Sequence, residues 1–127
     1  MPLSRRFDPA AGRVVVEIRG SFEAGATLRV LEEVLADPRW KPGFDLLIEY
    51  QEVQPSSGTP TVVRESSQRA VDLASLLEGS RLALVAGQDA MFGLNRMFQA
   101  YADESPLTIS VFRERAAAEQ WLARRGS

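Results

Sequence analysis

The apolar segment FDLLIEY (Phe44–Tyr50) indicates the fold class of this chain. It is nearly continuous apolar sequence, which is the composition of a strand buried on both faces in the middle of a partly parallel sheet. The segment RLALVAG (Arg81–Gly87) has the same character and lies further along the chain. Two such strands predict a sheet that helices cover.

Strands and helices alternate outward from these two segments. RVVVEIR (Arg13–Arg19) is β-branched and bounded by glycines, and we expect LSRRFD to pair with it through the turn DPAAG. LTISVFR (Leu107–Arg113) also has the pattern of a strand. The segments with helical periodicity are EAGATLRVLEEVLAD, TVVRESSQRAVDLASLL, DAMFGLNRMFQAYADE and ERAAAEQWLARR. The predicted order is ββαβαβαβα, a mixed sheet of the α/β class in a single domain over residues 1–127.

The periodicity also predicts which side of each helix is buried. In the first helix, the expected inner residues are Ala24, Leu28, Leu31 and Leu35, with Val34 alongside, and Arg29, Glu32 and Glu33 lie opposite. In the second, the expected inner residues are Val63, Ala70, Ala74 and Leu77, and the expected outer residues are Arg64, Glu65, Gln68, Arg69 and Asp72. Asp89 is placed to cap the third helix.

Composition and charge exclude several classes of function. The chain has 127 residues, 45% of them apolar, and a net charge of −2. Without a general basic field, we expect no nucleic-acid partner. No apolar run approaches the ~20 residues that span a bilayer, and MPLSRRFDPAAG lacks the apolar core of a signal peptide. We therefore expect no membrane span and a cytoplasmic location.

The chain contains neither cysteine nor histidine. Disulfides, thiolate nucleophiles, a Ser-His-Asp triad and imidazole metal sites are therefore absent. We expect no enzymatic activity, no metal and no cofactor. Glu49, Glu52 and Glu65 are the carboxylates that could meet as a hydrolytic pair or a hard-metal site, although no spacing among them demands either.

The segment QPSSGTP has two interpretations. Pro55 and Gly58 are turn residues, and Thr59–Pro60 suits the start of a helix, so the segment can be a plain connection. Alternatively, a loop between a central strand and a helix N-terminus lies where ligands gather in α/β sheets and where a phosphate is stabilised. Ser56 and Ser57 are on that account candidate phosphorylation sites.

The helix DAMFGLNRMFQAY carries a second candidate site. At about 100° per residue, one arc contains Met91, Leu94, Phe98, Tyr101 and Ala102, with Met97 at its edge, and we expect this arc to face the sheet. Phe92 falls on the polar side and is a candidate contact for a partner. Asn95 and Arg96 are candidate contacts for a polar ligand at the same edge of the sheet.

Two segments, together with SSG after a buried strand, carry a family resemblance. They are GSFEAGATLRVLEEVLADPRWKPGFDLLIEY and RLALVAGQDAMFGLNRMFQAYADESPLTISVFRERAAAEQWL, and they cover most of the chain. Their apolar patterns resemble the STAS domain of anti-sigma-factor antagonists, and more closely the SpoIIAA-like branch of small bacterial proteins. The resemblance implies a STAS-like α/β fold and a non-catalytic, regulatory module that binds a protein partner or self-associates.

The resemblance also implies a role for the serines. STAS antagonists usually carry Asp-Ser-Ser-Gly after this strand, with the first serine phosphorylated, which corresponds to Ser56. Here Pro55 stands in place of the aspartate, and TPTVV follows Gly58. Lipid-transfer domains related in fold suggest the alternative, a domain that binds a small apolar ligand or lipid. That alternative predicts an apolar cavity between the Met/Phe-rich helix and the sheet.

Overall fold

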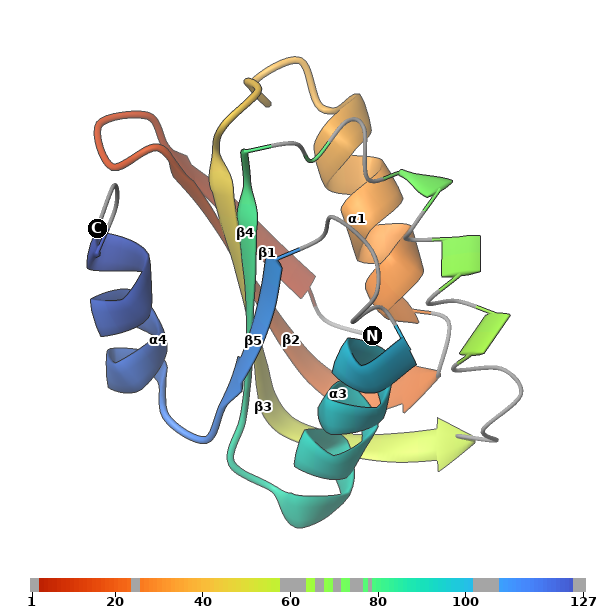
Figure 1. Cartoon of the computed structure of the whole chain (residues 1–127). Helices are drawn as coiled ribbons and strands as arrows, with labels where there is room; N and C mark the ends of the chain where they lie inside the picture. Colours follow the sequence, from red (N-terminus) through yellow and green to blue (C-terminus); the bar gives the residue numbers. More distant parts are fainter. Residues whose placement is uncertain are drawn as a thin grey trace.

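The computed structural model describes residues 3–23, 26–57, 64–65, 68–69, 72–73, 77, 79–101 and 108–124. Its elements are β1 (Leu3–Asp8), β2 (Arg13–Glu23), α1 (Ala26–Ala36), β3 (Asp45–Ser57), β4 (Arg81–Ala86), α3 (Asp89–Tyr101), β5 (Thr108–Phe112) and α4 (Arg115–Ala123). The strands form one mixed sheet in the order β1-β2-β3-β4-β5, in which β1 is antiparallel and the later pairs are parallel (Figure 1). The predicted α/β class is confirmed.

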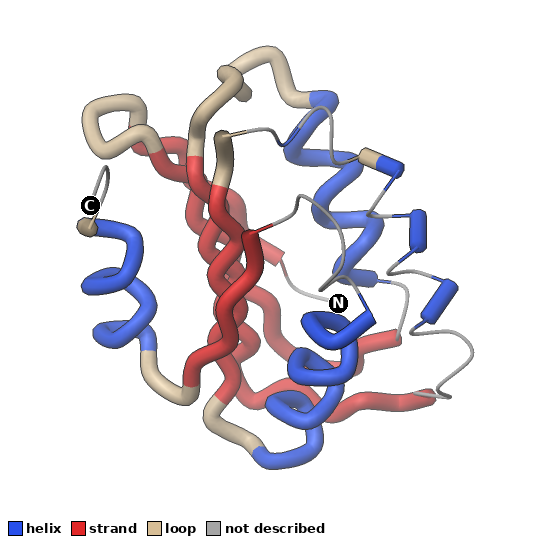
Figure 2. The backbone as a smooth tube through the Cα atoms, viewed as in Figure 1, coloured by secondary structure: helices blue, strands red, loops and turns tan. Residues whose placement is uncertain are grey.

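The strand order explains where the helices lie. Each crossover between parallel strands returns to the neighbouring strand, and the right-handed preference places the helices of successive crossovers on one face. Accordingly α1 and α3 cover the same face of the sheet (Figure 1). The helix α4 follows the last strand and covers the opposite face, so the sheet lies between two helical layers (Figure 2).

The larger hydrophobic core lies between the sheet and the helices α1 and α3, and we call it the major core. Its buried members are Val14, Val16, Ile18, Leu28, Val30, Leu31, Val34, Phe44, Leu46, Ile48, Tyr50, Leu82, Leu84, Ala86, Met91 and Phe98. The predicted inner positions Leu28, Leu31 and Val34 are buried in it, while Leu35 is half-buried. The outer side of α1 is exposed, as expected at Arg29, Glu32 and Glu33.

A minor core lies on the other face, beneath α4. Its buried members are Val15, Leu47, Ala83, Val85, Ala118 and Leu122, with Phe112 and Trp121 packed against them. Alternate residues of β2, β3 and β4 therefore enter opposite cores. The prediction that FDLLIEY and RLALVAG contain strands buried on both faces is confirmed, because Leu46–Ile48 and Leu82–Ala86 are buried throughout.

Two strands are longer than the sequence predicts. β2 continues to Glu23 and β3 to Ser57, and their register runs on through Gly20↔Val53 to Glu23↔Ser57. Since β4 pairs with β3 only up to Tyr50, β2 and β3 extend together past it. The expectation of a loop after Tyr50 is thus wrong as far as Ser57, because β2 supplies a parallel partner for this segment.

The remaining sequence predictions include several residues that do not belong to the described part of the chain. The residues outside it are Ala24, Gly58, Thr59, Pro60, Val63, Ala70, Ala74 and Ala102, together with the side chain of Tyr101. The expected outer residues Arg64, Glu65, Gln68, Arg69 and Asp72 are helical and exposed. Leu77 is buried, as predicted for the inner side.

The end of α1 is followed by a carboxylate that collects several donors. Asp37 accepts hydrogen bonds from the backbone N (2.9 Å), Nε (3.1 Å) and Nη2 (3.0 Å) of Arg39, and Nε of Arg5 lies 3.7 Å from its Oδ2. The side-chain and backbone hydrogen bonds from Arg39 lower the pKa of Asp37 to about 2. The contribution of this carboxylate to stability is therefore present above its unfolded pKa of about 3.9 and lost as the pH falls toward 2.

We expect Arg39→Gln to return the pKa of Asp37 toward its ordinary value, because the strongest donors are removed. An NMR titration of the side-chain carboxyl carbons measures it directly. Arg5→Gln is the matched control and should move the pKa less, since Arg5 makes only the longer contact. A wild-type Asp37 that titrates near 4 contradicts the assignment.

Candidate functional site

The structure describes some of the residues that the sequence singled out, and it places Asn95 and Arg96 differently. Ser56 and Ser57 are the last two residues of β3 rather than part of a loop, and their side chains lie outside the described residues. Arg96 is exposed, whereas Asn95 is only 2% exposed. The expectation that Asn95 and Arg96 hold a ligand together is therefore not met by their positions.

Helical geometry explains the burial of Asn95. It lies four residues after Met91 and three before Phe98, so it occupies the same side of α3 as these two members of the major core. Its Nδ2 is buried and has no hydrogen-bond partner within the described part of the chain. An unpaired buried amide of this kind costs about 1–3 kcal/mol.

Phe92 is covered by a side chain from a neighbouring element. Its ring is half-buried against the major core, and the guanidinium of Arg113 lies 4.0 Å from the ring centroid. Arg113 also donates to Asp89 Oδ1 (2.6 Å) and to the carbonyl of Gly87 (3.2 Å). The prediction of a ring on the open polar side is corrected: Arg113, which follows β5, shields it. Asp89 is the first residue of α3, and its carboxylate binds Arg113.

The strand order of this sheet is not the order that forms a ligand crevice at the carboxyl end of the strands. Ligand crevices in open α/β sheets form where the strand order reverses. The order of the described strands runs from β1 to β5 without reversal. Within this part of the chain, the sheet therefore does not form a crevice of that type beside Ser56 and Ser57.

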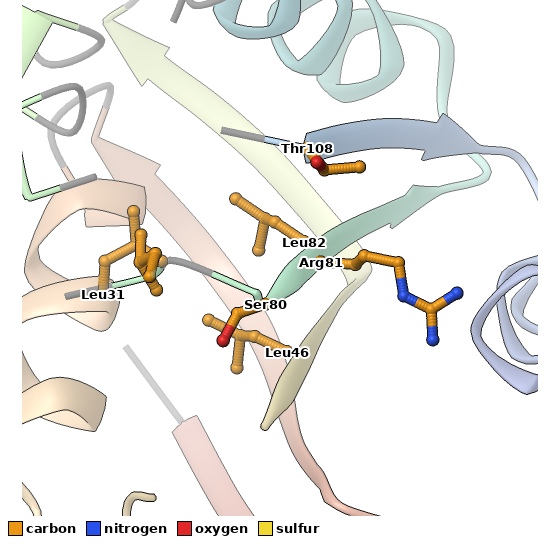
Figure 3. A pocket seen from close by; sticks show the side chains of 7 residues that line it. Leu31, Leu46, Ser80, Arg81, Leu82 and Thr108 are labelled. Carbon is orange, nitrogen blue, oxygen red and sulfur yellow. The ribbon is translucent and has the colours of Figure 1, made fainter. Parts of the chain in front are cut away.

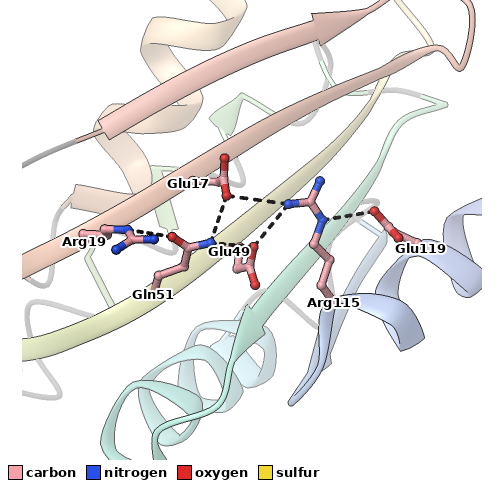
Figure 4. A network of polar contacts seen from close by, with 6 residues as sticks. All are labelled: Glu17, Arg19, Glu49, Gln51, Arg115 and Glu119. Atoms are coloured by element: carbon pink, nitrogen blue, oxygen red, sulfur yellow. Dashed lines mark hydrogen bonds and ion pairs between the residues drawn. The ribbon is translucent and has the colours of Figure 1, made fainter.

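A polar network on the α4 side of the sheet was not predicted (Figure 4). Glu17 on β2 and Glu49 on β3 are register partners, which sets two like charges side by side. Gln51 Nε2 donates to Glu17 Oε2 (2.8 Å) and to Glu49 Oε1 (3.1 Å). Nη1 of Arg115 lies 3.3 Å from Glu49 Oε1 and 3.7 Å from Glu17 Oε2. The amide and the guanidinium together offset the repulsion.

Two further side chains complete the network. Arg19 Nε donates to Gln51 Oε1 (2.8 Å), and Arg115 Nε donates to Glu119 Oε1 (3.0 Å). Burial lowers the pKa of the Arg115 guanidinium, but the hydrogen bonds and charges of Glu119 and Glu49 raise it by more, so the net direction is upward. Arg115 belongs to α4, whereas Glu17 and Glu49 belong to β2 and β3. The network therefore connects α4 to these two strands.

The expected group of Glu49, Glu52 and Glu65 is replaced by a different one. Glu49 pairs with Glu17, Glu65 is exposed, and the side chain of Glu52 lies outside the described residues. No three acidic side chains among the described residues are grouped so that they could hold a metal ion. The alternation in RVVVEIR indicates that Glu17 and Val16 lie on opposite faces of the sheet. That Glu17 is the register partner of Glu49 depends on how the strands pair in the folded sheet.

A small cavity lies at the amino end of β4 (Figure 3). Because β3 and β4 are parallel, Ser56 and Ser57 at the carboxyl end of β3 lie at the other end of the sheet. Its volume is about 10 Å³, and its lining residues are Leu31, Leu46, Leu77, Ser80, Arg81, Leu82 and Thr108. That is room for about one water molecule. Ser80 Oγ is buried without a hydrogen-bond partner in the described residues and is the natural contact for such a water. This cavity has neither the place nor the size that a lipid site requires.

No family model, curated protein or solved structure matches the chain. The fold and the site define its class as an α/β domain with a mixed sheet, crossover helices on one face and a C-terminal helix on the other. No helix among the described residues is long and apolar enough to cross a membrane.

Proposed function

We propose that the chain is a non-catalytic regulatory module that binds a protein partner, as its resemblance to anti-sigma-factor antagonists of the STAS and SpoIIAA-like type implies. One observation carries the proposal: the backbone of Ser56 and Ser57 ends a central strand, and Ser57 is still in register with Glu23 of β2. A strand with a paired neighbour holds the backbone of its last residues in the sheet. The sheet therefore places the backbone of both serines, and a phosphate on either would be attached at this strand end.

The N-termini of two helices lie at the same end of the sheet as this strand end. Both α1 and α3 begin at the same end of the sheet, because β2 and β4 end there (Figure 1). Helix N-termini carry partial positive charge, which stabilises anions. A phosphate adds a charge of about −1.5 to −2. Phosphorylation therefore changes the electrostatic character of this end of the molecule, which is a means of admitting or rejecting a protein partner.

The test is an intact-mass measurement on the protein purified from its own source, followed by fragmentation. We expect a covalent phosphate that survives denaturation and maps to Ser56 or Ser57, and that is lost in Ser56→Ala/Ser57→Ala. The chain offers a matched control in Ser66 and Ser67, another serine pair, whose replacement by alanine should leave the phosphate in place. A bare chain, or a phosphate on the control pair, contradicts the proposed switch.

Phe92 stays a candidate contact for the partner in this proposal. Its ring packs against the major core, so Phe92→Ala removes core packing together with any partner contact. Arg113→Gln is the better probe, because it uncovers the ring without deleting it.

A further inference from the structure

The strand β1 pairs on one side only within the described sheet. It is the antiparallel edge strand, and its register partners all belong to β2. An edge strand presents a row of unpaired N–H and C=O groups on its outer side. No side chain among the described residues bonds to the backbone of Leu3–Asp8. At the other edge, by contrast, Gln99 Nε2 donates to the carbonyl of Ile109 on β5 (3.0 Å). The β1 edge is therefore the more open of the two.

Two arginines lie at the centre of this edge strand, one on each face of the sheet. Arg5 pairs in register with Val16 of the major core, and Arg6 pairs with Val15 of the minor core. Their side chains therefore point to opposite faces. Arg6 is exposed, because α4 packs on β3, β4 and β5. The one carboxylate of the strand, Asp8, is its last residue and accepts a hydrogen bond from the backbone of the following turn. The edge thus carries positive charge on both faces.

A third cation is held over the same strand. The guanidinium of Arg39 lies 4.2 Å from the centroid of the Phe7 ring and donates through Nε and Nη2 to Asp37. The side chain of Arg39 is still 58% exposed, and its Nη1 makes no hydrogen bond with a described residue. Because the ring and the carboxylate hold the guanidinium in place, its remaining N–H groups are oriented in advance for a second acceptor.

These charges decide which strand the edge accepts. A strand added to a sheet lies about 4.8 Å from its neighbour, where opposite charges attract and like charges repel. The β1 of a second copy brings the same two arginines, which disfavours pairing between copies. A segment with two successive acidic residues instead places one carboxylate on each face. One of them meets Arg6, and the other meets Arg5 and Arg39. Since the whole chain has a net charge of −2, this cationic edge is a local feature.

We propose that β1 is a docking edge for an extended acidic segment of a partner protein, which adds to the sheet as a further strand. Backbone hydrogen bonds supply the affinity in this mode of recognition, and the side chains of the added strand supply the specificity. The inference does not depend on the proposed phosphorylation switch. Arg5 and Arg6 lie beside the amino half of β2, whereas Ser57 pairs with Glu23 at the carboxyl end of that strand.

NMR of the isotope-labelled full chain tests the proposal with a synthetic peptide. The probe is Thr-Val-Thr-Glu-Glu-Val-Thr, blocked at both ends. We expect the backbone amides of Leu3–Asp8 to shift, and those on the outer side of β1 to exchange more slowly with solvent. One control peptide carries Lys-Lys in place of Glu-Glu. The other keeps Glu-Glu but is methylated at every backbone nitrogen, so it cannot donate to β1. Neither control should protect the strand.

A protein variant tests the charge from the other side. Arg6→Glu changes an exposed side chain, so the fold should be preserved. It should weaken binding of the Glu-Glu peptide about tenfold and narrow the preference over the Lys-Lys peptide. Arg96→Glu is the matched control. It makes the same charge change on α3, which packs on β3, β4 and β5, and should leave binding unchanged.

Three results overturn the proposal. The first is a Glu-Glu peptide that leaves the amides of β1 unprotected. The second is equal binding of the methylated peptide, which indicates charge attraction without strand pairing. The third is protection of the same amides by a single-stranded oligonucleotide but not by the peptide, which indicates a nucleic-acid partner in place of a protein.

Discussion

Replacing Arg81 with methionine is expected to lower the free energy of unfolding by about 3–5 kcal/mol. Nη2 of Arg81 lies 2.8 Å from Oδ2 of Asp45, a carboxylate that is only 2% exposed. Methionine keeps much of the apolar stem but removes the guanidinium that pairs with the buried carboxylate. It also removes the donors to the last carbonyls of α4. Both losses act on the same variant, which makes this the largest single effect that we expect.

Urea unfolding at neutral pH measures this loss. Arg96→Met is the matched control, because Arg96 is exposed, and it should change stability by no more than about 0.5 kcal/mol. Asp45→Asn added to Arg81→Met removes the carboxylate charge and keeps an acceptor for the backbone N of residue 81, which donates to Asp45 at 2.9 Å. The double variant should recover at least half of the loss. A loss below about 1 kcal/mol in Arg81→Met means that the pair is not buried as described.

The second large effect is a loss of stability in alkaline solution. Tyr50 is buried, and its hydroxyl lies 2.7 Å from the hydroxyl of Thr27. Burial raises the pKa of Tyr50, and the hydrogen bond with Thr27 offsets this only in part. Below the unfolded pKa of about 10 both states hold the proton, so stability is unaffected. Above it the unfolded chain releases the proton first, and stability falls by about 1.4 kcal/mol per pH unit until the folded hydroxyl titrates.

Unfolding curves at several pH values between about 9 and 11.5 measure this slope. Tyr50→Phe alone leaves the Thr27 hydroxyl unpaired in the core, so the appropriate comparison is Tyr50→Phe/Thr27→Val, which removes both polar groups. All other ionisable side chains are the same in the two proteins, so the difference between the curves reports on Tyr50. The double variant should lose less stability with rising pH than the wild type. Parallel curves for the two proteins indicate that Tyr50 is accessible to water.

The candidate site was predictable only where local pattern decides position. The helical arc of α3 placed Met91 and Phe98 in the core, and it equally contains Asn95, whose polar chemistry suggested an outward role. Phe92 was assigned to the polar side from its angle alone. A helical angle does not reveal that Arg113, from another element, lies over the ring.

The network around Glu17 and Glu49 shows the same limit. Alternation within RVVVEIR indicates that Glu17 lies on the face opposite Val16. Nothing local indicates that Glu49 is its register partner, or that Arg115 from the end of the chain reaches both. Contacts between residues so distant in sequence depend on strand register and on the face that each helix covers.

The sequence by itself determined the α/β class, the N-terminal hairpin, the central strands and the buried side of α1, because hydrophobic periodicity and turn residues act within a few positions of one another. Only the tertiary structure decided that β2 and β3 run on together to Ser57, that the order of the described strands does not reverse and that Arg115 of α4 binds Glu17 and Glu49. These features arise from hydrogen bonds and ion pairs between distant segments. Their energies exist only once the chain has folded.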